Sequence, residues 1–279
     1  MAPATLHEWR MASLPLRKAW NLITSEQRRV YWKSVDRRRQ GWVPVVRSQV
    51  KKLFIKEGVA VEAAVAGGAA SGDAVVNRFQ KDWAKLYRSI YLNIGTDFAR
   101  SVHNEVAKAT LESVWESGVM EYLDPDGGNN IAKIVGIGKV SKEKIRAIIQ
   151  DGVEEGKHPF AISQDIKELY AGFSTYRADR IARTEVIAAS NLGGRLGAKS
   201  TGLVLEKEWI ATQDERTRDG ADGGFDHLSM DGQFSPIDDP WEVGGENLMF
   251  PGDSSLGASP GNTINCRCVE GYRRSEEDE

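Results

Sequence analysis

The sequence predicts an α+β protein with a mainly helical N-terminal two-thirds and a small, loop-rich α+β C-terminal module. Before residue 201, apolar residues recur every three or four positions through long stretches, which is the period of amphipathic helices. An alternation of period two, typical of a strand, begins only at 203–211. Residues 219–263 are rich in Gly, Asp, Pro and Ser, as expected of loops.

Two long helices open the chain, with a stretch of small residues between them. We expect the first helix over 24–54, with Thr24 or Ser25 as its cap and a break or kink at Pro44. Residues 62–74 (EAAVAGGAASGDA) predict a flexible connection.

The second helix is predicted by an apolar stripe spaced by three or four residues. The stripe consists of Phe79, Trp83, Leu86, Ile90, Ile94, Phe98 and Val102. Apolar content continues to about Trp115, and the sequence DPDGGNN at 124–130 ends the pattern.

Three further helices are expected at 141–156, 160–172 and 176–200. Ser141 is a candidate N-cap for the first of them, and Ser174 or Thr175 for the last. His158 precedes the middle helix, where a capping or surface role is expected.

The C-terminal module is expected to contain two strands. The first covers 203–211, and TINCRCVEGY (263–272) is the closing strand. The chain would then divide into a basic helical region (1–135), a second domain (136–272) and an acidic, solvated tail (273–279).

The net charge of −3 conceals a gradient along the chain. Residues 1–100 carry 18 Lys and Arg against 8 Asp and Glu, whereas residues 201–279 carry 6 against 18. This asymmetry indicates two surfaces with different partners, although unevenly charged solvated faces would give the same count.

Composition excludes several classes of protein. Two cysteines are too few for a disulfide-stapled secreted scaffold, and no apolar run approaches the ~20 residues of a membrane span. The N-terminal residues lack the continuous apolar stretch of a signal peptide. We therefore expect a soluble protein made in a reducing cytoplasm.

Cys266 and Cys268 are the sharpest local signal for a metal site. On a strand, both side chains would point to one side, so two thiolates could bind one ion. His227 is the natural third ligand, because it is the only histidine of the C-terminal module. A fourth ligand would come from Asp214, Asp226, Asp231 or water. No cofactor is certain: a structural zinc ion competes with thiols that pack as small hydrophobic groups and with a strained local disulfide.

Other polar residues of this region form a candidate structural network. They are Arg183, Glu185, Trp209, Asp214, Arg216, Arg218 and Asp231. If the strand continued that far, Asp214, Arg216 and Arg218 would share one face. Arg183 and Glu185 are expected to reach from their helix to the strand module. We favour hydrogen bonds that pin irregular loops over acid–base catalysis by a carboxylate and His227.

Basic residues interleave with aromatic residues on the first helix. The basic residues are Arg28, Arg29, Lys33, Arg37, Arg38 and Arg39. Such a helix could contact the phosphates of double-stranded DNA or an acidic protein surface. Tyr31, Val35 and Trp42 fall close to one stripe, so we expect them to pack rather than to stack on bases.

Familiar catalytic motifs are absent from the sequence. It contains no phosphate-binding P-loop, no Rossmann glycine pattern after a strand, no HExxH and no GxSxG. The sequence therefore predicts a protein that is not an enzyme.

Several motifs follow one another in a fixed order over roughly 140–272. They are IARTEVIAASNLG, KEWIATQDERTR, His227, MDGQ, FPGD and INCRC. This ordered set resembles the Mu F-type minor head, or head morphogenesis, proteins of tailed bacteriophages. In this chain DGADGGFD separates Arg218 from His227, whereas the histidine usually follows the arginines closely in the family.

The resemblance implies a low-copy minor capsid component of the virion that acts at the portal vertex in head morphogenesis. In some phages such proteins influence DNA packaging or ejection. The implied partners are the portal and other head proteins, with double-stranded DNA as a further candidate. The implied location is the head interior or portal vertex, after assembly in the host cytoplasm. The alternative is a metal-dependent nuclease or hydrolase delivered with the DNA, with Asp214, His227, Cys266 and Cys268 as its site.

Overall fold

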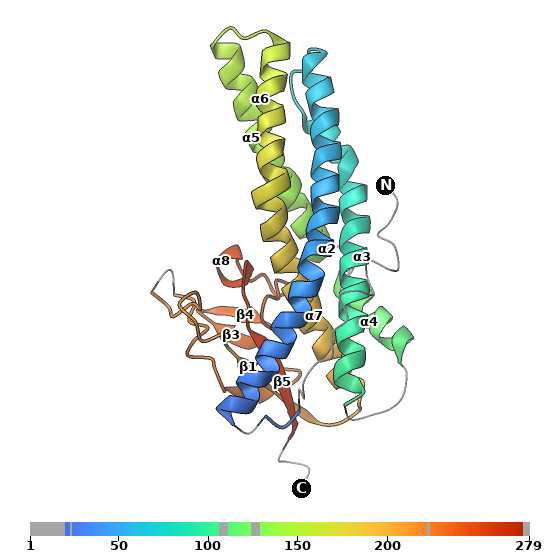
Figure 1. Cartoon of the computed structure of the whole chain (residues 1–279), viewed down its shortest axis with the longest axis vertical. Coiled ribbons are helices and arrows are strands. Elements are labelled where there is room, and N and C mark those ends of the chain that lie inside the picture. The colour runs from blue at the N-terminus through green and yellow to red at the C-terminus, as the bar shows by residue number, and fades with distance from the viewer. Residues whose placement is uncertain (1–19, 23, 106–110, 124–128, 222–223, 276–279) are drawn as a thin grey trace. The chain divides into compact units, whose positions relative to one another are not determined.

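The computed structural model describes residues 20–22, 24–105, 111–123, 129–221 and 224–275 (Figure 1). Helices dominate the described chain up to Lys199 and short antiparallel strands follow, which confirms the α+β class. The chain divides into two compact units. Unit 1 comprises residues 1–45, 90–123 and 183–279, and unit 2 comprises residues 46–89 and 124–182. No helix among the described residues is long and apolar enough to cross a membrane.

Helix α2 (Ser25–Ala66) is longer than the sequence predicts and runs through Pro44 without interruption. A proline inside a helix costs about 3 kcal/mol or more, because it lacks the N–H and crowds the preceding turn. Trp42, Val43 and Val46 around it are all buried. Of the predicted break or kink, the break is wrong, since the packing of the flanking turns outweighs the lost hydrogen bond.

Helix α3 (Asp73–His103) begins soon after α2 ends, so the predicted flexible connection shrinks to a short turn with Gly68 at φ +87°. The apolar stripe of α3 is buried from Trp83 to Val102, as its spacing predicts. Helix α4 (Glu112–Leu123) is a separate element that buries Trp115.

Helix α5 (Asn129–Glu154) starts well before the predicted N-cap. Ser141 lies inside it and its hydroxyl donates to the carbonyl of Ile137, so the capping role is wrong. The predicted stop falls partly on residues 124–128, which lie outside the described residues.

Helix α6 (Pro159–Gly172), the π-helical turn η1 (Phe173–Arg177) and helix α7 (Ala178–Lys199) follow one another without a break. His158 caps α6, because its ring nitrogen accepts from the N–H of Phe160 at 3.3 Å. The hydroxyl of Ser174 donates to the carbonyl of Ala171 within a continuous helical path. The predicted helix start at Ser174 or Thr175 is therefore wrong.

Unit 1 contains a three-stranded antiparallel sheet in the order β2-β1-β5. Its strands are β1 (Leu205–Ile210), β2 (Phe234–Pro236) and β5 (Val269–Arg274). A separate hairpin pairs β3 (Trp241–Val243) with β4 (Glu246–Leu248), and α8 (Pro260–Thr263) is one short turn of helix. The predicted closing strand thus begins later, at Val269, and the predicted tail starts inside β5.

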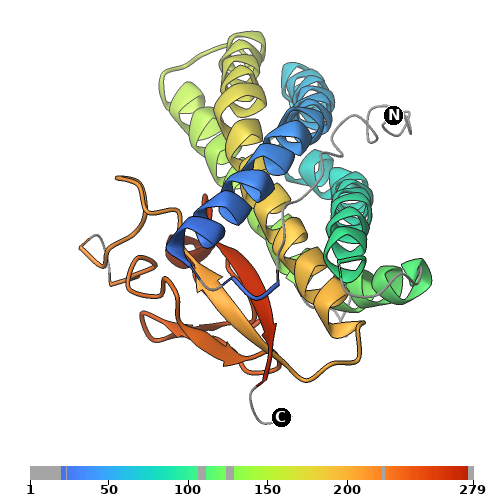
Figure 2. The same cartoon turned by 60° about the horizontal axis from the view of Figure 1, so that its bottom comes forward.

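The N-terminal half of α2 lies across this sheet within unit 1 (Figure 2). The Tyr31 hydroxyl donates to the carbonyl of Glu270 at 3.1 Å, and Arg28 pairs with Glu208 at 3.2 Å. Tyr31, Val35 and Trp42 are buried, which confirms that they pack.

Unit 2 has a core of its own around the buried carboxylate of Glu57. This carboxylate accepts from the indole N–H of Trp83 at 3.1 Å and from the Tyr170 hydroxyl at 2.8 Å. Burial raises the pKa of Glu57 more than these two donors lower it. Phe54 packs edge-on against Trp83 beside the same carboxylate.

Candidate metal centre and its surroundings

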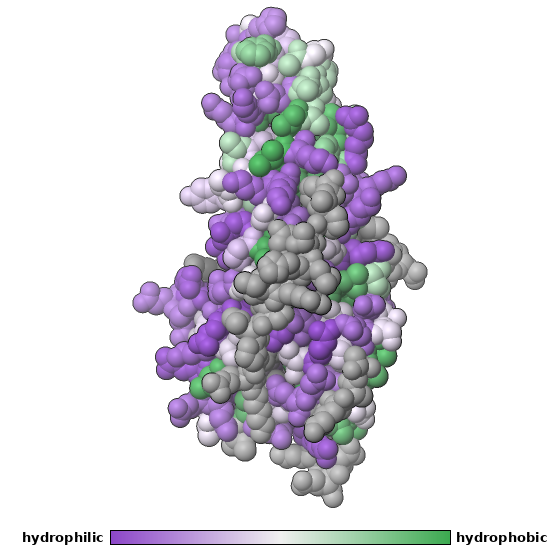
Figure 3. Space-filling view, turned by 45° about the vertical axis from the view of Figure 1, so that its right-hand side comes forward, coloured by the Kyte–Doolittle hydropathy of each residue, from purple (hydrophilic) through white to green (hydrophobic). Residues whose placement is uncertain are grey.

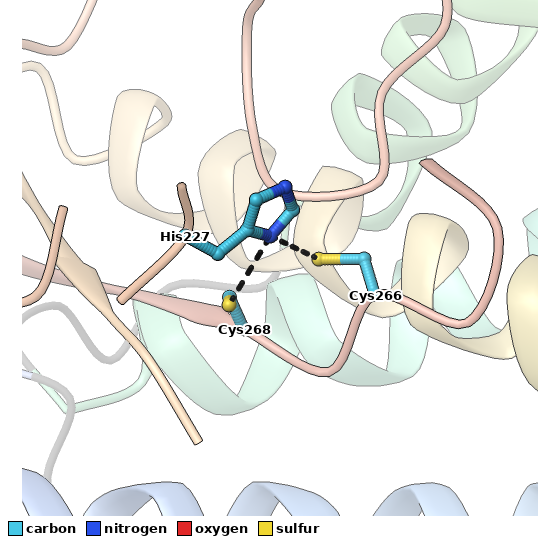
Figure 4. A group of neighbouring side chains, drawn as sticks. All are labelled: His227, Cys266 and Cys268. Carbon is cyan, nitrogen blue, oxygen red and sulfur yellow. Dashed lines mark hydrogen bonds between the residues drawn. The ribbon is translucent and has the colours of Figure 1, made fainter. Parts of the chain in front are cut away.

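His227, Cys266 and Cys268 converge inside unit 1 (Figure 4). Nδ1 of His227 lies 3.6 Å from Sγ of Cys266 and 3.7 Å from Sγ of Cys268. Their ligand atoms all lie within 4.8 Å of one another, and each residue is at most 2% exposed. Ligand atoms of one tetrahedral zinc ion lie about 3.5–4 Å apart. The cluster can therefore hold a metal ion.

The backbone brings the two thiols together by a route that differs from the predicted one. Both cysteines precede β5, so the alternation of a strand does not explain their convergence. Instead, α8 is followed by Asn265 in the left-handed region, at φ +56°. The N–H of Asn265 donates to Thr184 of α7 at 3.2 Å, and that of Cys266 to Thr263 at 3.3 Å. This turn fixes the start of the Cys266–Cys268 segment.

The electrostatics of the cluster favour a thiolate. Contact with Cys268, and then with His227, lowers the pKa of Cys266 well below that of a free thiol, although burial opposes it. Burial lowers the pKa of His227, but contact with Cys266 and the Asn262 hydrogen bond raise it by more. Both cysteines are free thiols. Contact with Cys266 and burial raise the pKa of Cys268 well above that of a free thiol, so this second thiol would lose its proton only as an ion binds.

Two residues without a metal-binding signal in the sequence complete the surroundings of the cluster. Oδ1 of Asn262 lies 2.7 Å from Nε2 of His227. Trp209 packs edge-on against the His227 ring at 5.4 Å, and its indole N–H has no hydrogen-bond partner among the described residues. Trp209 was predicted as part of the polar network, but Asn262 gives no sequence signal, since a lone asparagine after Pro-Gly is ordinary in loops.

A row of cysteine, histidine and asparagine side chains is also found in thiol hydrolases. The nucleophile of such an enzyme must meet a substrate. Here Cys266 is 2% exposed, His227 1% and Asn262 0%. The closed surroundings therefore suit a structural ion better than catalysis.

The three predicted carboxylates are engaged elsewhere. Asp214 accepts from Arg267 at 2.7 Å, and Asp231 accepts from the N–H of Ala211 at 2.8 Å. Asp226 accepts from the N–H of Ser229. Among the described residues no carboxylate joins the cluster, so a fourth ligand would have to be water or another small group.

The network residues hold loops, and the strand ends too early to place Asp214, Arg216 and Arg218 on one face. Strand β1 ends at Ile210, and the left-handed Gln213 at φ +58° leads into a turn that Asp214 caps. The Arg267 hydrogen bond, outweighing burial, holds the pKa of Asp214 well below its usual value. Arg216 follows Asp214 in that turn, and Arg218 donates to the carbonyl of Ile264 at 2.6 Å. The chain therefore turns at Asp214, and these side chains do not alternate as they would on a strand.

Arg183 and Glu185 are predicted to reach from α7 to the strand module, and the hydrogen bond described for Glu185 is to α3. Glu185 accepts from the Tyr91 hydroxyl of α3 at 2.7 Å, and Arg183 is exposed. The residue between them, Thr184, makes the contact with the C-terminal module through Asn265.

The basic residues of α2 separate into two groups. Arg38 is buried and pairs with Asp97 at 2.9 Å, while buried Arg39 donates to Ser190 at 2.7 Å and Asn191 at 2.6 Å. With Arg28 paired to Glu208, three of the six predicted contact residues serve unit 1 itself. The other three, Arg29, Lys33 and Arg37, are exposed.

Comparison with known proteins finds a matching family for the C-terminal part of the chain. Residues 143–270 match the family described as phage Mu protein F like protein. A stretch of 121 residues is 30% identical to the NAD(+)–arginine ADP-ribosyltransferase EFV of Enterococcus faecalis (strain ATCC 700802 / V583). This match covers 42% of the present chain and 23% of that relative, so the chain spans less than a quarter of the relative's length. No solved structure matches the chain. Residues 143–270 therefore match the phage Mu protein F-like family, the family that the ordered motifs resemble.

Proposed function

We propose that this chain is a low-copy minor capsid protein that acts at the portal vertex during head morphogenesis, with effects on DNA packaging or ejection. The match of residues 143–270 to a phage head family is the observation that carries the proposal. The chain would be assembled in the host cytoplasm and remain in the virion, bound to the portal or to other head proteins.

Its contact surface would be the exposed basic row of α2. Arg29, Lys33 and Arg37 are spaced by four residues, so they share one helical stripe. Among the residues coloured in Figure 3, hydrophilic side chains dominate the lower part of the view, and hydrophobic side chains gather towards its top. A charged row of this kind suits an acidic portal surface or the phosphates of double-stranded DNA.

We further propose that the His227–Cys266–Cys268 cluster binds one structural zinc ion. The region around it has short strands and long loops, so it gains little from regular hydrogen bonding. A metal clip at this point would supply folding free energy to the module. Its two thiolates and one imidazole match the ligand preference of zinc.

Charge reversal tests the contact surface. The full chain would be co-expressed with the portal protein of its phage, as wild type and as the triple variant Arg29→Glu, Lys33→Glu, Arg37→Glu. Lys51→Glu, Lys52→Glu, Lys56→Glu is the matched control, because these lysines are exposed on the same helix. Loss of portal co-purification in the first variant only supports the proposal. Wild-type protein that neither binds the portal nor occurs in particles refutes it.

A gel shift with double-stranded DNA separates the two partners. Binding that weakens steeply between 50 and 200 mM salt, roughly in proportion to the phosphates contacted, indicates DNA. The alternative of a metal-dependent nuclease is tested in the same reactions. Retained fold with lost cleavage in His227→Ala would favour catalysis, whereas joint loss of fold and metal favours the structural clip.

A further inference from the structure

We infer that Asn262 is the positioning residue of the metal centre: it holds His227 in the Nε2–H tautomer, so that Nδ1 is the ligand atom, and ties the centre to the β3–β4 hairpin. This inference rests on the proposed metal ion. It follows from the hydrogen bonds that link three side chains in a row in space: Glu246 to Asn262, and Asn262 to His227.

The orientation of the Asn262 amide is fixed by two acceptors. Its Nδ2 donates to the carbonyl of Val243 and to Oε2 of Glu246, both at 3.1 Å. A flipped amide would point its oxygen at two other oxygens, with no proton between them. The NH2 group therefore faces the hairpin, and Oδ1 faces His227.

The amide in turn determines the histidine tautomer. Oδ1 of Asn262 can only accept, so Nε2 of His227, 2.7 Å away, must carry the proton. In the neutral ring the lone pair then lies on Nδ1. Nδ1 is the atom that faces both sulfurs, as Figure 4 shows. The ring is thus oriented for metal binding without the metal having to turn it.

Glu246 anchors this hydrogen-bond relay, which runs from His227 through Asn262 to Glu246. The N–H of Ser259, at the start of α8, donates to Oε2 of Glu246 at 2.9 Å, and the same oxygen receives Asn262. Asn262 itself is fully buried. The relay therefore connects the ion to the hairpin and to α8, two elements without other regular pairing to the main sheet among the described residues. Partners of this kind typically change metal affinity 10–100-fold when they are removed.

The experiment compares zinc binding by the full-length wild type, Asn262→Ala, Asn262→Asp and the control Asn247→Ala. Asn247 is an exposed asparagine of the same hairpin. Zinc content is measured after purification, and affinity by competition with a chromophoric chelator. The cobalt-substituted forms report thiolate ligation by their charge-transfer absorption. A long-range 1H–15N spectrum of wild-type His227 reports which ring nitrogen carries the proton.

We expect Asn262→Ala to lose 10–100-fold in zinc affinity while its cobalt form keeps the thiolate absorption. Asn262→Asp retains an acceptor for Nε2–H but sets its second oxygen against the Val243 carbonyl and Glu246, so it should recover at most a small part of that loss. Asn247→Ala should match the wild type. The wild-type spectrum should show Nε2 protonated and Nδ1 bound to metal. Wild-type affinity in Asn262→Ala, or metal bound at Nε2, overturns the positioning role and leaves the zinc proposal standing. Wild-type protein that binds no zinc overturns the metal centre itself. The tautomer measurement holds even if Asn262→Ala fails to fold.

Discussion

The backbone of Gly193 in α7 lies against Gly95 in α3 so closely that a Cβ at position 193 would be 2.2 Å from the Gly95 carbonyl oxygen. One helical turn later, a Cβ on Gly197 would be equally close to the carbonyl oxygen of Ala99. Residues four apart share a helix face, so α3 and α7 meet within unit 1 along a stripe of small residues. Only glycine allows this approach.

Gly193→Ala should therefore destabilise the protein by roughly 1–3 kcal/mol or more, because the added carbon must push backbone against backbone. Gly172→Ala is the matched control: its φ is −62° and nothing lies within 4 Å of its added carbon. That variant should be neutral or up to about 1 kcal/mol more stable. Urea unfolding of both variants measures the difference, and equal stabilities would contradict the close packing.

Apolar periodicity predicts the helix faces that depend on local sequence. It does not predict helix ends and interruptions, which depend on packing against residues distant in the sequence. The buried stripe of α3 follows from its spacing, whereas Pro44 inside α2 obeys the packing of buried Trp42 and Val46. Ser141 has the chemistry of a cap, but Ile137 one turn earlier is already helical, so its hydroxyl bonds back into the helix. No local signal distinguishes these cases.

The candidate site shows the same division. Cys266, Cys268 and His227 could be named from residue type, because thiols two apart and a nearby histidine suit a metal. Asn262 could not, since its role depends on Val243 and Glu246 across the hairpin. The six basic residues of α2 look alike in sequence, and only tertiary contacts separate buried Arg38 and Arg39 from the exposed ones.

Lys207 and Glu270 form a buried pair that no sequence pattern indicates. Nζ of Lys207 lies 3.9 Å from Oε1 of Glu270 and donates to the Met249 carbonyl at 2.8 Å. Trp241 donates to the same carboxylate at 2.8 Å. Burial lowers the pKa of Lys207 to about 8, although Glu270 opposes the shift.

Lys207→Met and Glu270→Gln should each destabilise the protein by about 3 kcal/mol, because each leaves a buried polar partner without its counterpart. The double variant should cost at least about 1 kcal/mol less than the sum of the two single variants. A double-mutant cycle from urea unfolding at pH 7 measures this coupling. Strict additivity would show that the two side chains do not stabilise each other.

Metal removal gives a third expectation for the C-terminal module. If zinc binds His227, Cys266 and Cys268, a strong chelator should lower the melting temperature and expose the module to protease. Cys266→Ser should show the lowered melting temperature from the start and respond little to chelator. Readdition of zinc should restore only the wild type. A wild-type melting temperature that the chelator leaves unchanged would contradict a structural ion.

Glu208 should make the stability of the protein depend on pH. Burial raises the pKa of Glu208 from its usual 4.5 to about 7, although the facing Arg28 lowers it. Between these two values the folded protein holds a proton that the unfolded chain releases, so the stabilisation is complete below pH 4.5 and is lost as the pH rises through 7.

Glu208→Gln cannot ionise, so its stability should fall less over this range. The free energy of unfolding of this variant relative to wild type should rise by on the order of 1 kcal/mol between pH 5 and 8, since solvent screens part of the effect. Glu206→Gln, in the same strand and paired with Arg273, controls for the loss of a carboxylate. Urea unfolding at several pH values tests this, and parallel profiles for all three proteins would assign the pH dependence to other groups.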